Sequence, residues 1–315
     1  MADETAPQAE NRDTLQGFLF ALAAYLMWGL LPFYMKALSD VPAAEVVVHR
    51  ILWSVPVAGL VLVVLRRTAD LKTALNSWAM IRMAMLTAAI VSFNWGIYVW
   101  AVGNGRTVET ALGYYINPLF SVLLAATLLK EKLSRAQWTA IALAVIAVAI
   151  LTVEAGGLPW VSLALCVSWG FYAFFRKTLP IGPNQGFLLE VLILSPFALG
   201  YLLYLTAIGE NHFAAGGWAG MALLAGTGLV TAVPLISYAN GAKLLRLSTI
   251  GIMQYIAPSM IFVIAVFVFR EPFDVTRLIA FGFIWAALVV YSWSMASDAR
   301  RARARLPDVE PGQKT

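Results

Sequence analysis

Long apolar runs separated by short polar breaks dominate this chain of 315 residues. The runs are roughly 18 to 23 residues long, enough for a helix rising 1.5 Å per residue to cross a hydrocarbon core of about 30 Å. The connections are too short for a separate domain, so function is expected inside the membrane. We predict ten membrane-spanning helices at Gln16–Leu38, Glu45–Leu65, Met80–Val102, Val108–Leu129, Ala136–Val153, Leu158–Arg176, Gly186–Ile208, Trp218–Asn240, Thr249–Phe269 and Arg277–Ala296.

Composition agrees with an all-α integral membrane protein. The chain is 61% hydrophobic and 12% charged, and its mean hydropathy is +0.78. Soluble domains carry about 25% charged residues, roughly twice this share. The first apolar run lacks the basic start and the cleavage site of a secretory signal, so we expect it to remain as an uncleaved helix.

Two segments of the chain match each other in sequence. At an offset of 140 positions, Tyr98 matches Tyr238 and Pro118 matches Pro258, and at an offset of 141, Trp28-Gly29 matches Trp169-Gly170. A period this long makes each copy half of a fold rather than one module of an array. We therefore predict two five-helix repeats. The expected segments are an N-terminal tail (1–14), the first repeat (15–153), the second repeat (157–296) and an irregular basic tail (297–315).

Basic residues are distributed unevenly over the predicted loops. With ten spans and a cytoplasmic N-terminus, most of the 22 Lys and Arg residues face the cytoplasm, while the outer loops hold Lys36, Arg106, Arg270 and Arg277. This asymmetry follows the positive-inside rule and predicts a bacterial inner-membrane protein with both termini in the cytoplasm. Because each copy has five helices, the two copies are expected to cross the membrane in opposite directions.

An inverted repeat favours transport over other functions. Two such halves can exchange conformations, so states open to either side lie close in energy. The sequence has no P-loop, no paired-metal His/Glu motif and no nucleophile elbow, and its histidines are His49 and His212 alone. A single cysteine, Cys166, gives neither a disulfide framework nor a zinc site. We expect a transporter that is not an enzyme and needs no cofactor and no metal.

Several motifs resemble a known family. They are the run from Asn104 to Leu119 (NGRTVETALGYYINPL), His49-Arg50-Ile51-Leu52-Trp53-Ser54, Thr231-Ala232-Val233-Pro234-Leu235, and the run from Leu247 to Pro258 (LSTIGIMQYIAP). Together they resemble RarD-type permeases of the EamA group in the drug/metabolite transporter superfamily, in register from about residue 14 to 296. The resemblance implies ten helices, two five-helix repeats and an inner-membrane permease, and it leaves the substrate open. A glycine common in the wider group is replaced by Ala140 and Ala280.

Three ionisable residues lie inside predicted spans, where hydrocarbon should exclude them. They are His49 and Arg50 in the second span and Glu190 in the seventh. One interpretation is structural: an Arg50–Glu190 ion pair, or Arg50 reaching to the outer interface. The other is a charged wall of the permeation path, with His49 or Glu190 exchanging protons. Inversion of the copies places Arg50 and Glu190 at different depths, which favours separate roles.

Amides and aromatic residues form a second candidate set at mid-depth. Pro118 and Pro258 each remove a helix hydrogen bond and free the carbonyl four residues earlier, at Tyr114 and Gln254. Such interruptions are typical of substrate sites in inverted-repeat transporters, although the prolines can instead bend helices for packing while the amides join neighbouring helices. The candidate residues are Trp28, Asn94, Trp95, Tyr98, Tyr114, Asn117, Trp169, Tyr238, Gln254 and Tyr255. Glu131 and Glu271, between spans, are expected to cap a following helix or hold a loop cation.

We therefore expect a permease that moves a small polar organic solute, metabolite-like, amino-acid-like or drug-like, by alternating access. Family analogy favours export, as secondary or facilitated transport. The alternatives are a passive channel or a lipid flippase on the same scaffold, or an intramembrane enzyme that uses His49, Arg50 and Glu190. Expected partners are the solute and membrane lipids, with no nucleic acid, in a monomer or a homodimer.

The topology can be tested by cysteine labelling in intact cells. A membrane-impermeant maleimide should modify Glu210→Cys from the periplasm, but Lys72→Cys and Arg300→Cys only after the cells are permeabilised. Labelling of Lys72→Cys in intact cells would overturn the inverted-repeat interpretation.

Overall fold

The structure, a computed structural model, describes residues 14–304 except 65–68, 129, 131, 179–180 and 246. Every regular element among the described residues is a helix. In chain order these elements are α1 (Leu15–Lys36), α2 (Ala43–Val64), α3 (Ala69–Leu75), α4 (Trp78–Gly103), α5 (Thr107–Leu128), α6 (Arg135–Glu154), α7 (Trp160–Thr178), α8 (Pro183–Ile208), α9 (Gly217–Lys243), α10 (Leu247–Met253), α11 (Ile256–Val263), η1 (Ile264–Val268) and α12 (Val275–Ala304).

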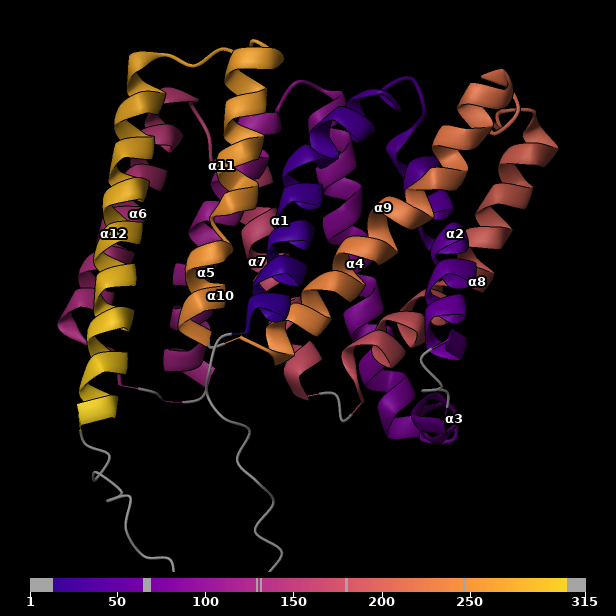
Figure 1. The fold of residues 1–315 in the computed structure, drawn as a ribbon. Coiled ribbons are helices and arrows are strands. Elements are labelled where there is room, and N and C mark those ends of the chain that lie inside the picture. Colours follow the sequence, from indigo (N-terminus) through magenta and orange to yellow (C-terminus); the bar gives the residue numbers. More distant parts are fainter. Residues whose placement is uncertain are drawn as a thin grey trace, which may run out of the picture.

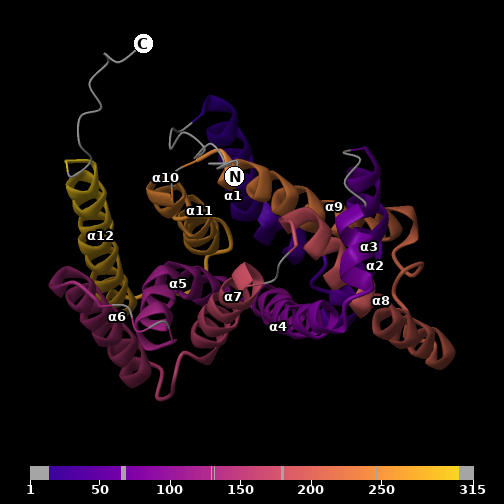
Figure 2. The same cartoon turned by 90° about the horizontal axis from the view of Figure 1, so that it is seen from below.

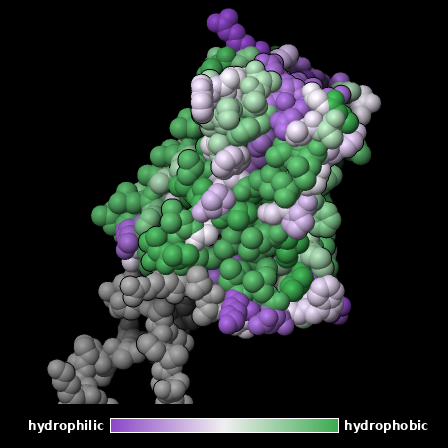
Figure 3. Space-filling view, turned by 90° about the vertical axis from the view of Figure 1, so that its right-hand side faces the viewer, coloured by the Kyte–Doolittle hydropathy of each residue, from purple (hydrophilic) through white to green (hydrophobic). Residues whose placement is uncertain are grey.

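Eight of the described helices are long and apolar enough to cross a membrane. Two shorter apolar helices, Trp160–Arg176 and Ile256–Val268, occupy the sixth and ninth predicted spans. In Figure 1 most helices run between an upper and a lower edge; α1 begins and α12 ends at the lower edge, where α3 also lies. Figure 3 shows a face that is mostly apolar through its middle, with hydrophilic residues gathered mainly toward its two ends. The protein is therefore a multi-pass membrane protein, and the count of ten spans stays a prediction.

The ninth predicted span is interrupted just before Pro258. α10 ends at Met253, α11 begins at Ile256, and the helix then widens into the π-helical turn η1. Pro258 has no N–H to bond the carbonyl of Gln254, and its ring collides with that carbonyl, so the backbone opens at Gln254–Tyr255. Pro118 differs, because α5 continues through it without a break. The structure thus interrupts the helix beside Pro258, and a kink at Pro118 within α5 stays a prediction.

Two local features differ from the sequence-based expectation. The connection before the third predicted span contains the short helix α3, which its polar residues did not suggest. α12 continues to residue 304, so the first part of the expected irregular tail is helical. Alanine and arginine are strong helix formers, and the run from Ala296 to Ala304 contains no glycine or proline to end the helix. Residues 1–13 and 305–315 of the predicted tails lie outside the described residues.

The main packed pairs of helices have counterparts made by the equivalent helices of the other half of the chain. α1 packs on α9 as α7 packs on α4, α2 packs on α9 as α8 packs on α4, and α1 packs on α11 as α7 packs on α5. Three further pairs, α6–α12, α2–α8 and α5–α11, join equivalent helices of the two halves. Figure 2 shows α1, α4, α7, α9 and α11 gathered around the middle of the molecule, with α6 and α12 together at one end.

Two glycines let the crossing helices approach closely. A Cβ at Gly29 of α1 would lie 2.6 Å from Met260 Sδ of α11, and a Cβ at Gly170 of α7 would lie 2.4 Å from Phe120 Cδ1 of α5. Gly29 and Gly170 match in the repeat, as do Phe120 and Met260. The same contact is therefore made twice, once with each half supplying the glycine. Small residues at such crossings are the usual means of close helix packing in membranes.

The segments that follow α5 and η1 share an unusual backbone conformation. Lys130 and Arg270, which match at the offset of 140, have φ of 56° and 55°, the left-handed region that side chains with a Cβ rarely adopt. The next residue, Glu271, accepts hydrogen bonds from the backbone N–H groups of Thr107 and Val108, both at 2.8 Å. Glu271 thus caps a helix, as predicted, but that helix is α5 rather than the following α12. The matching prediction for Glu131 lies outside the described residues.

Candidate functional site

A cavity lies at mid-depth, between helices of both halves. Its volume, counting the open space at its mouth, is about 890 Å³. Its walls are largely aromatic, with a few amides and no Asp, Glu, His, Lys or Arg. The lining residues are Tyr25, Trp28, Leu31, Asn94, Trp95, Tyr98, Tyr114, Asn117, Trp169, Leu235, Tyr238, Gln254, Ala257, Pro258 and Ile261.

Most of the mid-depth candidates from the sequence line this cavity. The structure brings together there Trp28, Asn94, Trp95, Tyr98, Tyr114, Asn117, Trp169, Tyr238, Gln254 and Pro258. Five candidates lie elsewhere: His49, Arg50, Pro118, Glu190 and Tyr255. Tyr255 packs against the apolar cluster between α5, α6 and α12 instead. Sequence reasoning missed Tyr25, although its spacing of three from Trp28 places both side chains on one helix face.

The aromatic walls are packed edge to face across the repeat. Trp28 and Trp169, which match in the sequence, have ring centroids 6.4 Å apart with planes at 81°. Trp28 also contacts Tyr25 at 5.7 Å and Tyr238 at 5.5 Å, and Trp169 contacts Tyr114 at 6.3 Å. Tilted and edge-to-face rings pack well and present both π faces and ring edges to the cavity. Such a wall suits a flat or apolar part of a solute.

The two asparagines of the cavity are bonded to the backbone of α7. Asn94 Nδ2 donates to Ser168 Oγ at 2.8 Å and to the Leu165 carbonyl at 3.2 Å. Asn117 Nδ2 donates to the Cys166 carbonyl at 3.1 Å. Ser168 and Asn94 are buried, so these bonds join helices in the way amides do in membrane proteins. The amides therefore form part of the cavity wall, while both N–H groups of Asn94 and one N–H group of Asn117 are bonded to α7.

Arg50 is buried at the junction of α2, α4 and α9. Its Nε donates to Thr231 Oγ1 at 3.0 Å, and its Cζ lies 4.7 Å from the ring centroid of Trp95. Nη1 is buried without a hydrogen-bond partner. The side chain is 4% exposed, so Arg50 does not reach to the outer interface. It therefore stands directly behind Trp95, one side chain away from the cavity.

Glu190 is paired with Arg176 of α7 and not with Arg50, the partner that the structural interpretation required. Arg176 Nε lies 3.4 Å from Glu190 Oε1, and the Tyr172 hydroxyl donates to Glu190 Oε2 at 3.1 Å. Glu190 is 1% exposed, and this pairing neutralises it within the packed helices. Sequence reasoning counted Arg176 as a loop cation, because it stands at the end of the predicted span.

Both histidines of the chain gather at one buried carboxylate. Glu45 at the start of α2 is fully buried; it accepts the backbone N–H of His212 at 2.8 Å and lies 2.7 Å from His212 Nδ1. His49 Nε2 lies 4.0 Å from Glu45, and the His49 ring stacks on Phe213 with centroids 5.2 Å apart. Neither ring nitrogen of His49 has a hydrogen-bond partner. Sequence reasoning named His49 and missed Glu45, which it took as the first residue of a span.

Known proteins resemble this chain over most of its length. The EamA-like transporter family model matches residues 15–153. A protein called RarD from Streptomyces exfoliatus is 41% identical over 304 residues, which cover 96% of each chain. An uncharacterized transporter of Vibrio cholerae is 38% identical over 93% of this chain and 98% of its own. Protein RarD of Escherichia coli (strain K12) is 36% identical over 93% and 99%.

One solved crystal structure also superposes on this fold. It covers 91% of this chain and 98% of its own, with a TM-score of 0.58 and 18% sequence identity. At that identity the likeness concerns the fold alone.

The two prolines form a matched pair for testing the interrupted helix. In Pro258→Ala an alanine restores the N–H that bonds the Gln254 carbonyl, so α10 and α11 should join and the cavity wall should move. We expect solute transport to fall roughly tenfold, the effect of about 1.4 kcal/mol on a barrier. Pro118→Ala is the control, because α5 is already continuous there and Pro118 does not line the cavity.

The rates are to be measured in liposomes, with the solute that an untargeted comparison of deletion and overexpressing cells identifies. Transport at the wild-type rate by both Pro258→Ala and Pro118→Ala would show that both prolines serve packing alone.

Proposed function

The chain belongs to the EamA-like transporter family as a RarD-type permease, and from this premise we propose that it carries a small polar organic solute by alternating access around the mid-depth cavity. Family and relatives indicate a transporter rather than an enzyme. We place it in the bacterial inner membrane with both termini in the cytoplasm, on the distribution of basic residues. Export is the proposed direction, by analogy with the family.

One observation carries this proposal: the cavity is walled by matching residues of both halves. Trp28 matches Trp169 and Tyr98 matches Tyr238, and all four line it. Helix pairs on either side of the cavity also exchange when the halves are exchanged. If the halves can adopt each other's conformations, a cavity between them opens first to one side and then to the other without a large change in energy.

Because the cavity lies between inverted halves, the solute-binding site can stay in place during transport. When α1 and α11 close one end of the cavity, the equivalent pair α7 and α5 can separate at the other end. The glycine contacts Gly29–Met260 and Gly170–Phe120 stand at these two crossings. The solute would remain against the aromatic walls while the helix pairs exchange roles, which distinguishes a carrier from a channel open at both ends.

The source of energy follows from the ionisable groups. Because the sequence has no ATP-binding motif, the solute gradient or protons must drive transport. Glu190 is neutralised by Arg176, whereas His49 has two unpartnered ring nitrogens beside the buried Glu45. A proton on His49 would create a buried ion pair with Glu45. We therefore place proton binding at Glu45 and His49, where His212 ties the α8–α9 connection to α2.

Cysteine accessibility tests the carrier mechanism without knowledge of the solute. Ala257→Cys, in a Cys166→Ala background, should react with a membrane-impermeant maleimide from both faces, in right-side-out and in inside-out vesicles. Ala265→Cys is the matched control, because Ala265 is fully buried in the α5–α6–α12 cluster and should react from neither face.

Locking one end then separates a carrier from a channel. The rings of Phe33 on α1 and Phe269 after η1 lie 5.7 Å apart at the upper edge. A short bifunctional crosslink between Phe33→Cys and Phe269→Cys should abolish labelling of position 257 from the periplasm and accelerate it from the cytoplasm, since a carrier held closed on one side populates the other state. In a channel the cytoplasmic rate would stay unchanged. No labelling from either face would exclude this cavity as the pathway.

Proton binding at His49 predicts a pH-dependent equilibrium between the two states. Between about pH 5 and 8, where histidine titrates, the ratio of labelling rates of Ala257→Cys from the two faces should change. Glu45→Gln and His49→Gln should each remove that change. Persistence of the pH dependence in both variants would contradict the assignment, and its loss in His212→Gln alone would move the proton to the loop histidine.

A further inference from the structure

Arg50 is a buried cation with no carboxylate partner in the part of the chain that the structure describes. Its hydrogen bond to Thr231 and its contact with Trp95 leave Nη1 unpartnered, and the side chain is 4% exposed. A buried charge is ordinarily paired, because an unpaired one loses its hydration without compensation. The missing partner is therefore the most informative feature of this part of the molecule.

No carboxylate among the described residues is available to Arg50. The three buried ones are committed elsewhere: Glu45 to His212, Glu190 to Arg176, and Glu271 to the backbone at the start of α5. The cavity walls contain no acidic residue. The anion that would balance Arg50 must then come from outside the described part of the chain.

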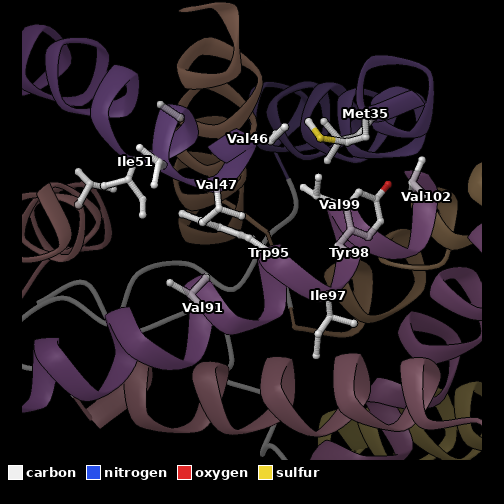
Figure 4. Packing of buried hydrophobic residues seen from close by; sticks show 14 of the residues in the cluster. Met35, Val46, Val47, Ile51, Val91, Trp95, Ile97, Tyr98, Val99 and Val102 are labelled. Atoms are coloured by element: carbon white, nitrogen blue, oxygen red, sulfur yellow. The ribbon is translucent and has the colours of Figure 1, made fainter. Parts of the chain in front are cut away.

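Tyr98 supplies a second unpartnered donor at the same place. Its hydroxyl is buried without a hydrogen-bond partner, although its ring lines the cavity. Figure 4 shows Trp95 beside Val47, and the Tyr98 ring rising from α4 so that its oxygen ends near Met35, Val99 and Val102, which offer no acceptor. Arg50 is close enough to Tyr98 and Tyr114 to interact electrostatically with both. Both unpartnered donors thus lie behind rings that line the cavity, Nη1 of Arg50 behind Trp95 and the hydroxyl at the far end of the Tyr98 ring.

Resting on the proposed function, we infer that the transported solute is an organic monocarboxylate with a flat, aromatic body. Its carboxylate would accept hydrogen bonds from Nη1 of Arg50 and the hydroxyl of Tyr98 when the Trp95 ring, which separates Arg50 from the cavity, moves aside, since a guanidinium and a hydroxyl are strong donors to that group. Its body would lie against Trp28, Trp169 and Tyr238, whose edge-to-face arrangement suits a ring.

The charge at the site limits which head group the solute can carry. One guanidinium without a second cation in the cavity wall matches a single negative charge, so a carboxylate fits better than a doubly charged phosphate. An ammonium group finds no carboxylate in the wall to neutralise it. Both N–H groups of Asn94 and one of Asn117 are bonded to α7, so recognition of the head group falls chiefly to Arg50 and Tyr98.

A matched series of small ligands tests the inference through protection of Ala257→Cys from maleimide. Phenylacetate, phenylacetamide, phenethylamine and phenyl phosphate share one ring and differ in the head group. Phenylacetate should protect at a concentration roughly ten- to hundredfold lower than phenylacetamide, the effect of one charge-assisted hydrogen-bonding site. Phenethylamine should not protect.

Substitutions test whether Arg50 and Tyr98 cause the preference for phenylacetate. Arg50→Gln should remove the preference for phenylacetate, Arg50→Lys should keep part of it, and Tyr98→Phe should weaken protection by phenylacetate. Arg106→Gln is the matched control, because Arg106 also lies over tryptophan rings but is already paired with Glu109; it should keep the full preference. If Arg50→Gln fails to fold, Tyr98→Phe, which removes one oxygen, still decides the question.

The two proposals fail in different ways. Equal protection by phenylacetate and phenylacetamide, tighter protection by phenyl phosphate, or protection by phenethylamine would overturn the monocarboxylate inference while cysteine 257 is still labelled from both faces. Absence of labelling from either face would instead refute the transport pathway itself.

Discussion

Gly29 of α1 packs against Met260 of α11, and Gly170 of α7 packs against Phe120 of α5. A methyl group at either glycine would overlap the opposing side chain, so these crossings set how close the halves can come. The residues that precede the glycines, Trp28 and Trp169, are thereby placed in one cavity with ring centroids 6.4 Å apart. The edge-to-face packing of the cavity's aromatic walls rests on this spacing.

The aromatic residues of the cavity wall follow the repeat, whereas the charged residues near the cavity do not. The aromatic residues match between the halves, but Arg50 matches Val191 and His49 matches Glu190 at the offset of 141. Duplication can therefore account for the two interchangeable conformations that we propose, whereas later divergence placed a cation behind Trp95 and a histidine–carboxylate group one helical turn earlier on α2. In hydrocarbon such groups persist only where they are paired or serve a function. Pairing accounts for Glu190, through Arg176, and leaves Arg50 and His49 to be explained by solute and proton.

The sequence was most informative where the signal is periodic or repeated. Apolar runs located the helices, and residues matched by the repeat, such as Trp28 with Trp169, indicated the cavity lining. Ion pairs and hydrogen bonds between helices could not be predicted from the sequence. They depend on the rotation and depth of each helix, and the hydropathy pattern gives neither. Glu45 with His212 and Glu190 with Arg176 are of this kind. Pro118 and Pro258 show the same limit: identical chemistry leaves one helix continuous and the other interrupted.

The central claim is that both halves of one chain wall a single cavity, with Trp28 facing Trp169. Crosslinking in the native membrane tests it most directly, using Trp28→Cys and Trp169→Cys in a Cys166→Ala background with a protease site inserted at Gly156–Gly157. After treatment with a short bifunctional reagent and proteolysis, the two halves should remain joined at the mass of one chain. Halves that separate, or that remain joined only as a dimer of two chains, would contradict the claim.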